Sequence, residues 1–234
     1  GSEMCIRDSF GEVGEYMRLE LKMLLRNKRC KASLRSVAML VIIFSIILSF
    51  SSTYDHMKSF VQVYSFLGFG MVILIQLMGF EGNYIDGLMT RKESIKSLLT
   101  AKYYIYSLAE IIPLILLIPA FVMGKASLLG AVALIFLTTG PVYCILFQLA
   151  VYNHKTVPLN ESITGKQSMN TGMQMLISFG LFIVPTTLYG TLPMLLGQTW
   201  AYIVILIIGL GFTLISPMWI NNCLLYTSPS PRDP

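Results

Sequence analysis

Glu110 is the residue whose position most suggests chemistry. It is an acidic residue well inside a long apolar run, about 9 Å beyond Tyr104 at 1.5 Å per residue. An ionisable group at membrane depth is costly and suggests a contact with a proton or a substrate. The plainer interpretation, which the sequence favours, is a shallow carboxyl group or one hydrogen-bonded to a polar residue such as Gln76 or Gln148. Two prolines follow, at positions 113 and 119, and predict a bend in this helix.

The familiar catalytic and metal-binding motifs are missing. The chain has no G-x-x-x-x-G-K-[ST] P-loop, no H-E-x-x-H and no G-x-S-x-G. Its two histidines, His56 and His154, fall in different connecting segments, and the cysteine spacing suggests neither a disulfide framework nor a zinc site. We therefore predict no catalytic residue, no metal and no cofactor, and expect any ATP hydrolysis to belong to a partner subunit.

The elements that would hold Glu110 are predicted from composition. The chain has 234 residues, of which 55% are hydrophobic and 12% charged, whereas a soluble domain carries roughly 25% charged residues. Apolar runs of about 18 residues recur, which is the length that crosses a hydrocarbon core. Such segments must be helical because lipid offers the backbone no hydrogen-bond partner. The sequence thus predicts an all-α polytopic membrane protein whose domain, 36–220, holds six transmembrane helices, at 36–53, 61–80, 104–123, 127–152, 172–192 and 198–220.

The two ends of the chain differ from the part between them. Residues 1–9, GSEMCIRDS, and residues 223–234, CLLYTSPSPRDP, resemble translated sequencing-adapter sequence. We expect both ends to be artefacts and the gene to continue beyond them.

The distribution of lysine and arginine predicts the orientation in the membrane. Short connections place Lys58 and Lys125 on one side. Since positive residues collect in the cytoplasm, we expect residues 10–35, both long loops and the C-terminal end on the cytoplasmic side of the membrane. Thirteen positive residues fall on that side: Arg18, Lys22, Arg26, Lys28, Arg29, Lys31, Arg35, Arg91, Lys92, Lys96, Lys102, Lys155 and Lys166.

Residues 10–35 are predicted to form an amphipathic interfacial helix and a basic segment. At 100° per residue, five charged residues fall within a sector of about 80°: Glu15, Arg18, Lys22, Arg26 and Arg29. The opposite side carries Val13, Met17, Leu21, Leu24 and Leu25, which is typical of a helix lying in the membrane plane. Glu20 falls on the apolar side, either as a snorkelling carboxylate, which we favour, or paired with the cytoplasmic end of a span.

The loop between the second and third predicted spans carries a helix of its own. Its sequence from residue 81 is EGNYIDGLMTRKESIKSLLTAKY, in which Thr90-Arg91-Lys92-Glu93 forms a capping box. Ile95, Leu98 and Leu99 give the short helix that follows an apolar edge. A plain interpretation is a helix that rests on the membrane.

This order of elements resembles the permease subunits of ABC-2-type exporters. In those proteins an acidic residue, a Gly-[TL]-x-x-[LM] stretch and a later lysine form the segment that touches the ATPase. The matching positions here are Glu81, Gly87, Leu88, Ile95, Leu99 and Lys102. More closely, YMRLELKMLLRNKR at 16–29, GLMTR at 87–91 and AKY at 101–103 resemble an uncharacterised family of Bacteroidota membrane proteins classed as ABC-2 permease-like, of which this chain would be a later half.

The resemblance implies the membrane-spanning part of an ATP-driven exporter. Its expected partners are a separate ABC ATPase subunit, the lipid bilayer, and a second permease half or a second copy of the chain, with no nucleic acid. Two alternatives remain, a secondary transporter fragment that uses Glu110 and an ion gradient, and a non-transporting scaffold or assembly protein. The expected ATPase-contact residues are Glu81, Asp86, Gly87, Arg91, Lys92, Glu93 and Lys102.

Overall fold

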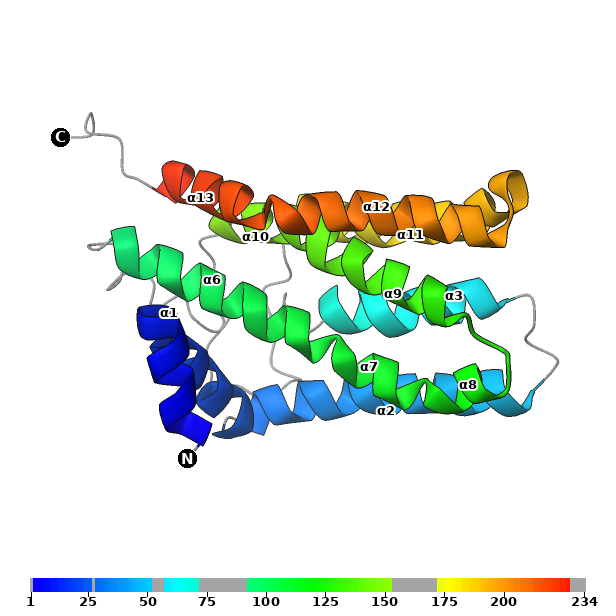
Figure 1. Ribbon diagram of the computed structural model, residues 1–234, viewed down its shortest axis with the longest axis horizontal. Helices are drawn as coiled ribbons and strands as arrows, with labels where there is room; N and C mark the ends of the chain where they lie inside the picture. The colour runs from blue at the N-terminus through cyan, green and yellow to red at the C-terminus, as the bar shows by residue number, and fades with distance from the viewer. Residues whose placement is uncertain (1, 27, 52–56, 72–91, 153–171, 228–234) are drawn as a thin grey trace.

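The computed structural model describes residues 2–26, 28–51, 57–71, 92–152 and 172–227, and every regular element in these ranges is a helix. The predicted all-α class is therefore confirmed. The helices lie mostly along the long axis of the molecule (Figure 1). They are α1 Ser2–Arg26, α2 Lys28–Phe50, α3 Lys58–Val63, the π-helical η2 Tyr64–Gly68, α6 Lys92–Ala109, α7 Ile111–Leu116, α8 Ile118–Val122, α9 Leu128–Leu137, the π-helical η3 Thr138–Val142, α10 Tyr143–Tyr152, α11 Gly172–Leu196, α12 Gln198–Leu214 and α13 Ser216–Thr227.

Several helices are long and apolar enough to cross a membrane. Four single stretches qualify within the described residues, and the pair Gln198–Leu214 and Ser216–Asn222, bent by 54°, adds a fifth if it counts as one span. They overlap five of the predicted spans, while the predicted span at 61–80 is described only as far as residue 71. The four single stretches are Cys30–Phe50, Lys96–Leu116, Leu128–Gln148 and Phe179–Leu196.

The long helical path from α6 to α8 is interrupted where its prolines require it. Proline lacks an N–H group, and its ring would clash with the carbonyl four residues earlier. α6 accordingly ends at Ala109, four residues before Pro113, and a second break falls at Leu117, just before Pro119. The Ser45 hydroxyl of α2 donates to the Leu116 carbonyl at this second break, at 2.7 Å. The predicted bend after Glu110 is thus a pair of interruptions.

α6 corrects one prediction about the loop. The short helix expected after Thr90 and the span expected from residue 104 are one continuous helix, Lys92–Ala109. No glycine or proline occurs between its start and residue 104, so nothing ends the first segment before the second begins. Thr90 itself lies outside the described residues.

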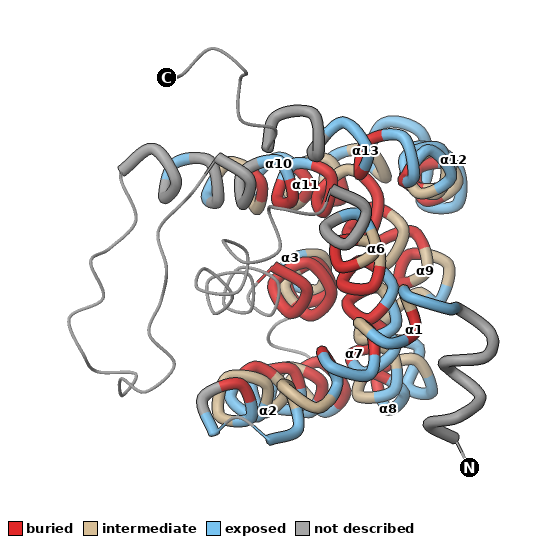
Figure 2. The backbone as a smooth tube through the Cα atoms, turned by 90° about the vertical axis from the view of Figure 1, so that its left-hand side faces the viewer, coloured by how far each residue is buried: buried red, intermediate tan, exposed pale blue. Residues whose placement is uncertain are grey.

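The interior is formed around α3 and η2. Viewed along the bundle, α3 is buried between α2 and the layer of α10 and α11 (Figure 2). The Tyr189 hydroxyl of α11 donates to the side-chain oxygen of Gln62 in α3, and the Tyr189 ring stacks on Tyr202 of α12, with the ring centroids 5.1 Å apart. These contacts hold α3 to the outer helices.

α13 is held to the bundle by Trp219. Its ring lies edge-on to Tyr103 of α6, with the ring centroids 5.4 Å apart, and its indole N–H donates to the Phe212 carbonyl at 3.1 Å. That carbonyl lies just before the bend at Ile215, where Pro217 prevents a regular continuation of α12. The bend therefore turns α13 toward α6 and α10.

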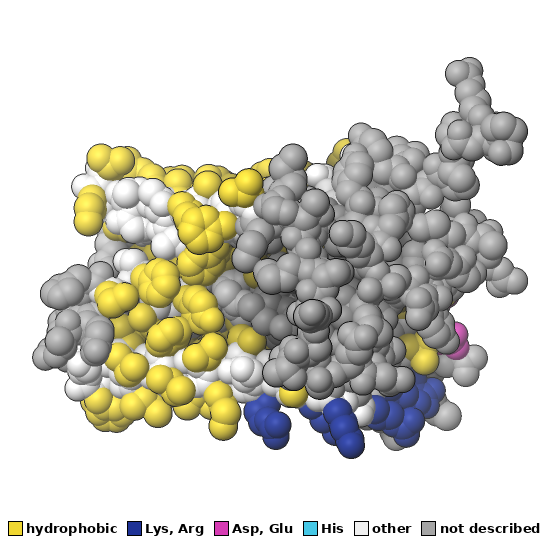
Figure 3. Space-filling view, turned by 180° about the vertical axis from the view of Figure 1, so that it is seen from behind, with side chains coloured by type: hydrophobic (Ala, Val, Ile, Leu, Met, Phe, Trp, Pro, Cys, Tyr) yellow, Lys and Arg dark blue, Asp and Glu magenta, His cyan; other side chains and the backbone are white. Residues whose placement is uncertain are grey.

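Charge and apolar surface are separated along the molecule. In the view from behind, hydrophobic side chains cover much of the described surface on the left, and lysine and arginine side chains gather along the lower edge further to the right (Figure 3). The start of α3 and the turn between α8 and α9 lie at the end of the bundle opposite α1 (Figure 1). Lys58 and Lys125 belong to these two segments in the sequence.

Candidate functional site

A buried ion pair joins α1 to α6. The Lys102 ammonium group lies 2.6 Å from Oε1 of Glu20, and both side chains are at most 3% exposed. The Tyr106 hydroxyl, one turn further along α6, donates to the same oxygen. The Lys102 nitrogen also lies 5.7 Å from the centre of the Tyr106 ring. One carboxylate oxygen of α1 thus receives two donors from α6.

This pair shows that the prediction of a snorkelling Glu20 is wrong. Met17 is buried, and Val13 and Leu24 pack against the core, so much of the apolar side of α1 faces protein. Glu20 lies on that side and would be a costly buried charge without a partner. Lys102 supplies the compensating charge, which was the less favoured alternative.

A second contact fixes α1 nearer the start of α6. The Ser97 hydroxyl donates to Glu12 at 3.3 Å, on the exposed side of the two helices. Leu19 and Leu25, by contrast, are well exposed. α1 is therefore clamped to α6 along one side and presents leucines with basic residues on the other.

The expected ATPase-contact residues fall into two groups. Glu81, Asp86, Gly87 and Arg91 lie outside the described residues, and of Lys92 and Glu93 the structure describes only the backbone, in the first turn of α6. Lys102 is 1% exposed, and its ammonium group is bound to Glu20 inside the bundle. The structure therefore places Lys102 at the junction of α1 with α6 rather than on the surface.

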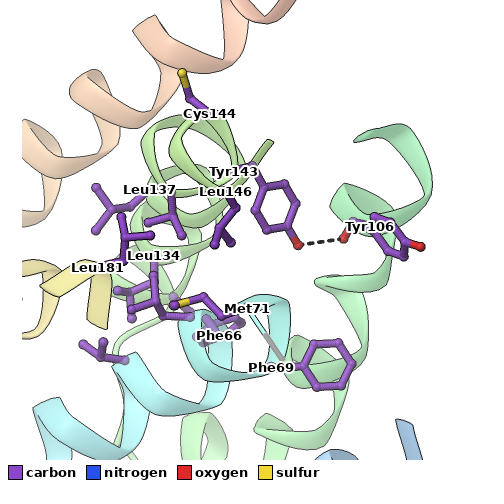
Figure 4. Close-up of a cluster of buried hydrophobic side chains, with 14 of the residues drawn as sticks. Phe66, Phe69, Met71, Tyr106, Leu134, Leu137, Tyr143, Cys144, Leu146 and Leu181 are labelled. Atoms are coloured by element: carbon purple, nitrogen blue, oxygen red, sulfur yellow. Dashed lines mark hydrogen bonds between the residues drawn. The ribbon is translucent and has the colours of Figure 1, made fainter. Parts of the chain in front are cut away.

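Glu110 lies at the break between α6 and α7 and is fully buried. The Tyr143 hydroxyl of α10 lies 3.2 Å from Oε1 of Glu110. It also lies 3.3 Å from the Tyr106 carbonyl oxygen, and Figure 4 draws this second contact as a dashed line. The Glu110 N–H bonds to the Ser107 carbonyl at 3.3 Å, so the break deprives the Tyr106 carbonyl of its regular helical donor. Tyr143 therefore serves both the carboxyl group and the broken helix.

The hydrogen-bond partner of Glu110 differs from the two that we expected. Tyr143 takes that place, whereas the amide of Gln148 lies 3.8 Å from the Cys144 sulfur and Gln76 lies outside the described residues. The expected hydrogen bond is present with a different partner, and the depth of Glu110 in the membrane stays a prediction.

Three departures from regular α-helix meet at this carboxyl group. Besides the break at Glu110, η2 ends at Gly68, two residues before Gly70, and η3 ends just before Tyr143. A Cβ atom on Gly70 would lie 2.1 Å from Oε1 of Glu110 and 2.9 Å from both Thr138 and the Tyr143 hydroxyl. π-Helical turns inside α-helices are frequent at functional sites. Gly70 thus allows η2 and η3 to close around Glu110.

Three buried polar atoms have no hydrogen-bond partner among the described residues. They are the Tyr103 hydroxyl, the Ser107 hydroxyl and Oε2 of Glu110, on successive turns of one helical path. Buried polar groups in proteins are nearly always bonded to protein or to water. This stripe is therefore a polar feature that the described protein atoms leave incomplete.

No metal site accompanies this stripe in the described part of the chain, where no three His, Cys, Asp or Glu residues come close enough to hold an ion.

The model of the DUF5687 family, a family of unknown function, matches residues 2–226. This chain belongs to that family. No curated protein and no solved structure matches the chain. For a DUF5687 protein, arguments about function therefore rest on the arrangement of its own residues.

Sequence reasoning missed two residues of this DUF5687 site. Tyr143 lies in an apolar run, where a tyrosine reads as an ordinary core or interfacial residue. Gly70 carries no signal beyond its small size. The one available hint was Pro141, because a proline within an apolar run marks an irregular turn next to the residue that carries the hydroxyl.

Proposed function

We propose that this chain is the membrane-spanning permease part of an ATP-driven ABC-2-type exporter that works with a separate ATPase subunit. The observation that carries the proposal is the junction of α1 with α6. The segment 81–102, which resembles the ATPase-contact segment of such permeases, continues directly into α6, and α6 is tied to α1 by the buried Glu20–Lys102 pair.

This junction suits the transmission of movement from a partner into the bundle. A helix moves as a stiff rod, and the ion pair makes α1 and α6 move together. The break at Glu110 lies at the far end of α6 and provides a hinge between α6 and α7. A displacement applied at 81–92 would thus reach the centre of the bundle at Glu110.

The membrane arrangement belongs to the same proposal. The chain would have six spans in a bacterial inner membrane, with residues 10–35 in the cytoplasm. The segregation of positive residues in the sequence supports this orientation. A second permease half or a second copy of the chain would complete the pathway.

The test is capture of the ATPase encoded beside the intact gene. The double variant Arg91→Glu/Lys92→Glu should capture much less ATPase and should still insert in the membrane, because neither residue lies in a predicted span. Charge steers such association and reversal of charge opposes it.

The matched control is Lys58→Glu/Lys125→Glu, which reverses two charges at the opposite end of the bundle and should capture the ATPase as the unmodified chain does. Undiminished capture by Arg91→Glu/Lys92→Glu would count against docking at this segment.

A second candidate function is secondary transport through Glu110. The observation that favours it is a fully buried carboxyl group with one oxygen unpartnered among the described residues. In that case the purified chain, reconstituted in vesicles without any ATPase, should dissipate an imposed proton or sodium gradient, and Glu110→Gln should abolish this leak.

A further inference from the structure

We infer that Glu110 is a reversible proton-binding site at the centre of the bundle, with the Tyr143 hydroxyl as the group that responds to the proton. Its ligand is a proton taken up from water. The inference concerns the chemistry of one carboxyl group and does not depend on whether an ATPase docks at segment 81–102.

The first argument is the surroundings of the carboxyl group. Among the described residues, the groups shown at the carboxyl group or beside it are Tyr143, the Tyr106 carbonyl, the methyl group of Thr138 and the backbone of Gly70. None of these is a cation, and Lys102 is bound to Glu20 two turns earlier on α6. A buried carboxylate without a cation is costly. A proton neutralises it and needs no cavity, which suits a site where Gly70 packs directly against Oε1.

The second argument is that Tyr143 has two acceptors for one hydroxyl proton. Oε1 of Glu110 lies at 3.2 Å and the Tyr106 carbonyl oxygen at 3.3 Å. A charged carboxylate is the stronger acceptor, so the hydroxyl donates to Glu110 when the carboxyl group is ionised. When a proton adds to the carboxylate and forms the neutral acid, the Tyr106 carbonyl becomes the better acceptor. Because the Tyr106 carbonyl is exposed by the break between α6 and α7, the proton alters the bonding that stabilises this break.

The third argument is a route for the proton along α6. The Tyr103 and Ser107 hydroxyls and Oε2 of Glu110 lack partners among the described residues, and all lie on one side of the same helical path. Ser107 lies close enough to the Tyr103 hydroxyl to interact with it, and Ser107 and Glu110 are neighbours on the helix surface, three residues apart. Thr213 and Ser216, at the bend between α12 and α13, lie close to the Tyr103 hydroxyl and supply further polar groups. These polar groups would relay a proton between Glu110 and the end of the bundle that carries α1.

The test is modification of the full chain in membranes by dicyclohexylcarbodiimide, an apolar reagent that reacts with protonated carboxyl groups. Mass spectrometry should find the adduct on Glu110, at a rate that falls as the pH rises from about 5 to about 9. Glu110→Gln should carry no adduct at this position. Absence of the adduct at acidic pH would overturn the inference, and so would a rate that is constant across the range, which would mean a permanently protonated structural carboxyl group. Protection by sodium chloride at constant pH, compared with choline chloride, would overturn it in favour of a cation site.

The variant Tyr143→Phe tests the switch. It removes the hydrogen bond that stabilises the carboxylate, so labelling of Glu110 should persist to higher pH, by about one pH unit or more. The matched control is Tyr189→Phe, which removes another buried tyrosine hydroxyl, bound to Gln62, and should leave the profile unchanged. A Tyr143→Phe profile identical to that of the unmodified chain would exclude the switch. If either variant fails to fold, labelling of the unmodified chain still decides whether Glu110 binds a proton reversibly.

Discussion

At the scale of single residues, the partner of a charged side chain decides its role. Glu20 and Lys102 are 82 positions apart and form a buried pair. Buried pairs are poor evidence of net stability, since apolar residues of similar volume often replace them without loss. Removal of one partner alone, however, leaves an uncompensated charge in the interior. The pair therefore makes the attachment of α1 depend on both residues together.

We expect Lys102→Met to destabilise the folded chain by about 3–5 kcal/mol, because it leaves the Glu20 carboxylate buried without its cation. The double variant Glu20→Gln/Lys102→Met should recover much of this loss. Thermal unfolding in detergent and trypsin cleavage within α1 measure the two effects. Glu15→Gln, on the exposed side of the same helix, is the control and should change stability by less than about 0.5 kcal/mol. A Lys102→Met variant as stable as the unmodified chain would refute the energetic role of the pair.

For Glu20 and Glu110, the sequence predicted the position of each residue but not its partner. The amphipathic pattern identified Glu20 as an exception on the apolar side of its helix, yet whether it meets lipid or a lysine depends on a helix that is distant in sequence. Likewise, the position of Glu110 within an apolar run was evident, whereas its bond to Tyr143 depends on where η3 turns α10. A local pattern shows which residues need a partner and cannot show which partner they find.

At the scale of elements, glycine sets how closely two helices approach. Gly209 of α12 lies against α9, where a Cβ atom would be 2.6 Å from the Phe136 carbonyl carbon and 2.7 Å from the Leu137 nitrogen. Both are backbone atoms, which cannot turn aside as a side chain can. Gly211, two residues later, has nothing within 4 Å of its Cβ position.

We therefore expect Gly209→Ala to force α9 and α12 apart and to cost roughly 1–3 kcal/mol of stability. Gly211→Ala should be neutral or stabilising by up to about 1 kcal/mol, since alanine favours a helix over glycine. Thermal unfolding of the two variants in the same detergent makes the comparison. Equal melting temperatures for the two variants would mean that the approach at Gly209 has little energetic weight.

The elements themselves were largely predictable because hydropathy is a local property. Four predicted spans overlap single helical stretches long and apolar enough to cross a membrane, and a fifth overlaps a pair of helices bent by 54° that qualifies only if it counts as one span. The boundary within α6 was wrong, because hydropathy marks where lipid-compatible residues begin and a helix continues through polar residues until something stops it. The π-helical turns were not predicted, although Pro141 lies inside η3 and is the one local sign of an irregular turn there.

At the scale of the whole molecule, the two ends of the bundle differ in charge. α1 and the start of α2 bring most of the described lysines and arginines to one end, and the turns from α8 to α9 and from α11 to α12 lie at the other (Figure 1). Positive residues are retained on the cytoplasmic side during insertion. The end that holds α1, and with it the Glu20–Lys102 junction, should therefore face the cytoplasm, where an ATPase would meet it.

Cysteine labelling tests this orientation. Cys30 and Cys144 are buried, so a background in which Cys5 and Cys223 are replaced by serine should react little with an impermeant maleimide. In sealed cells, Leu195→Cys, at a position 80% exposed at the end of α11, should be labelled from outside. Ser162→Cys, in the predicted cytoplasmic loop 153–171, should be labelled only after the cells are permeabilised. As a control, both introduced cysteines should react in permeabilised cells, which would show that each of them is accessible to the reagent. Labelling of Ser162→Cys in sealed cells would reverse the orientation, and an ATPase could then not dock at segment 81–102.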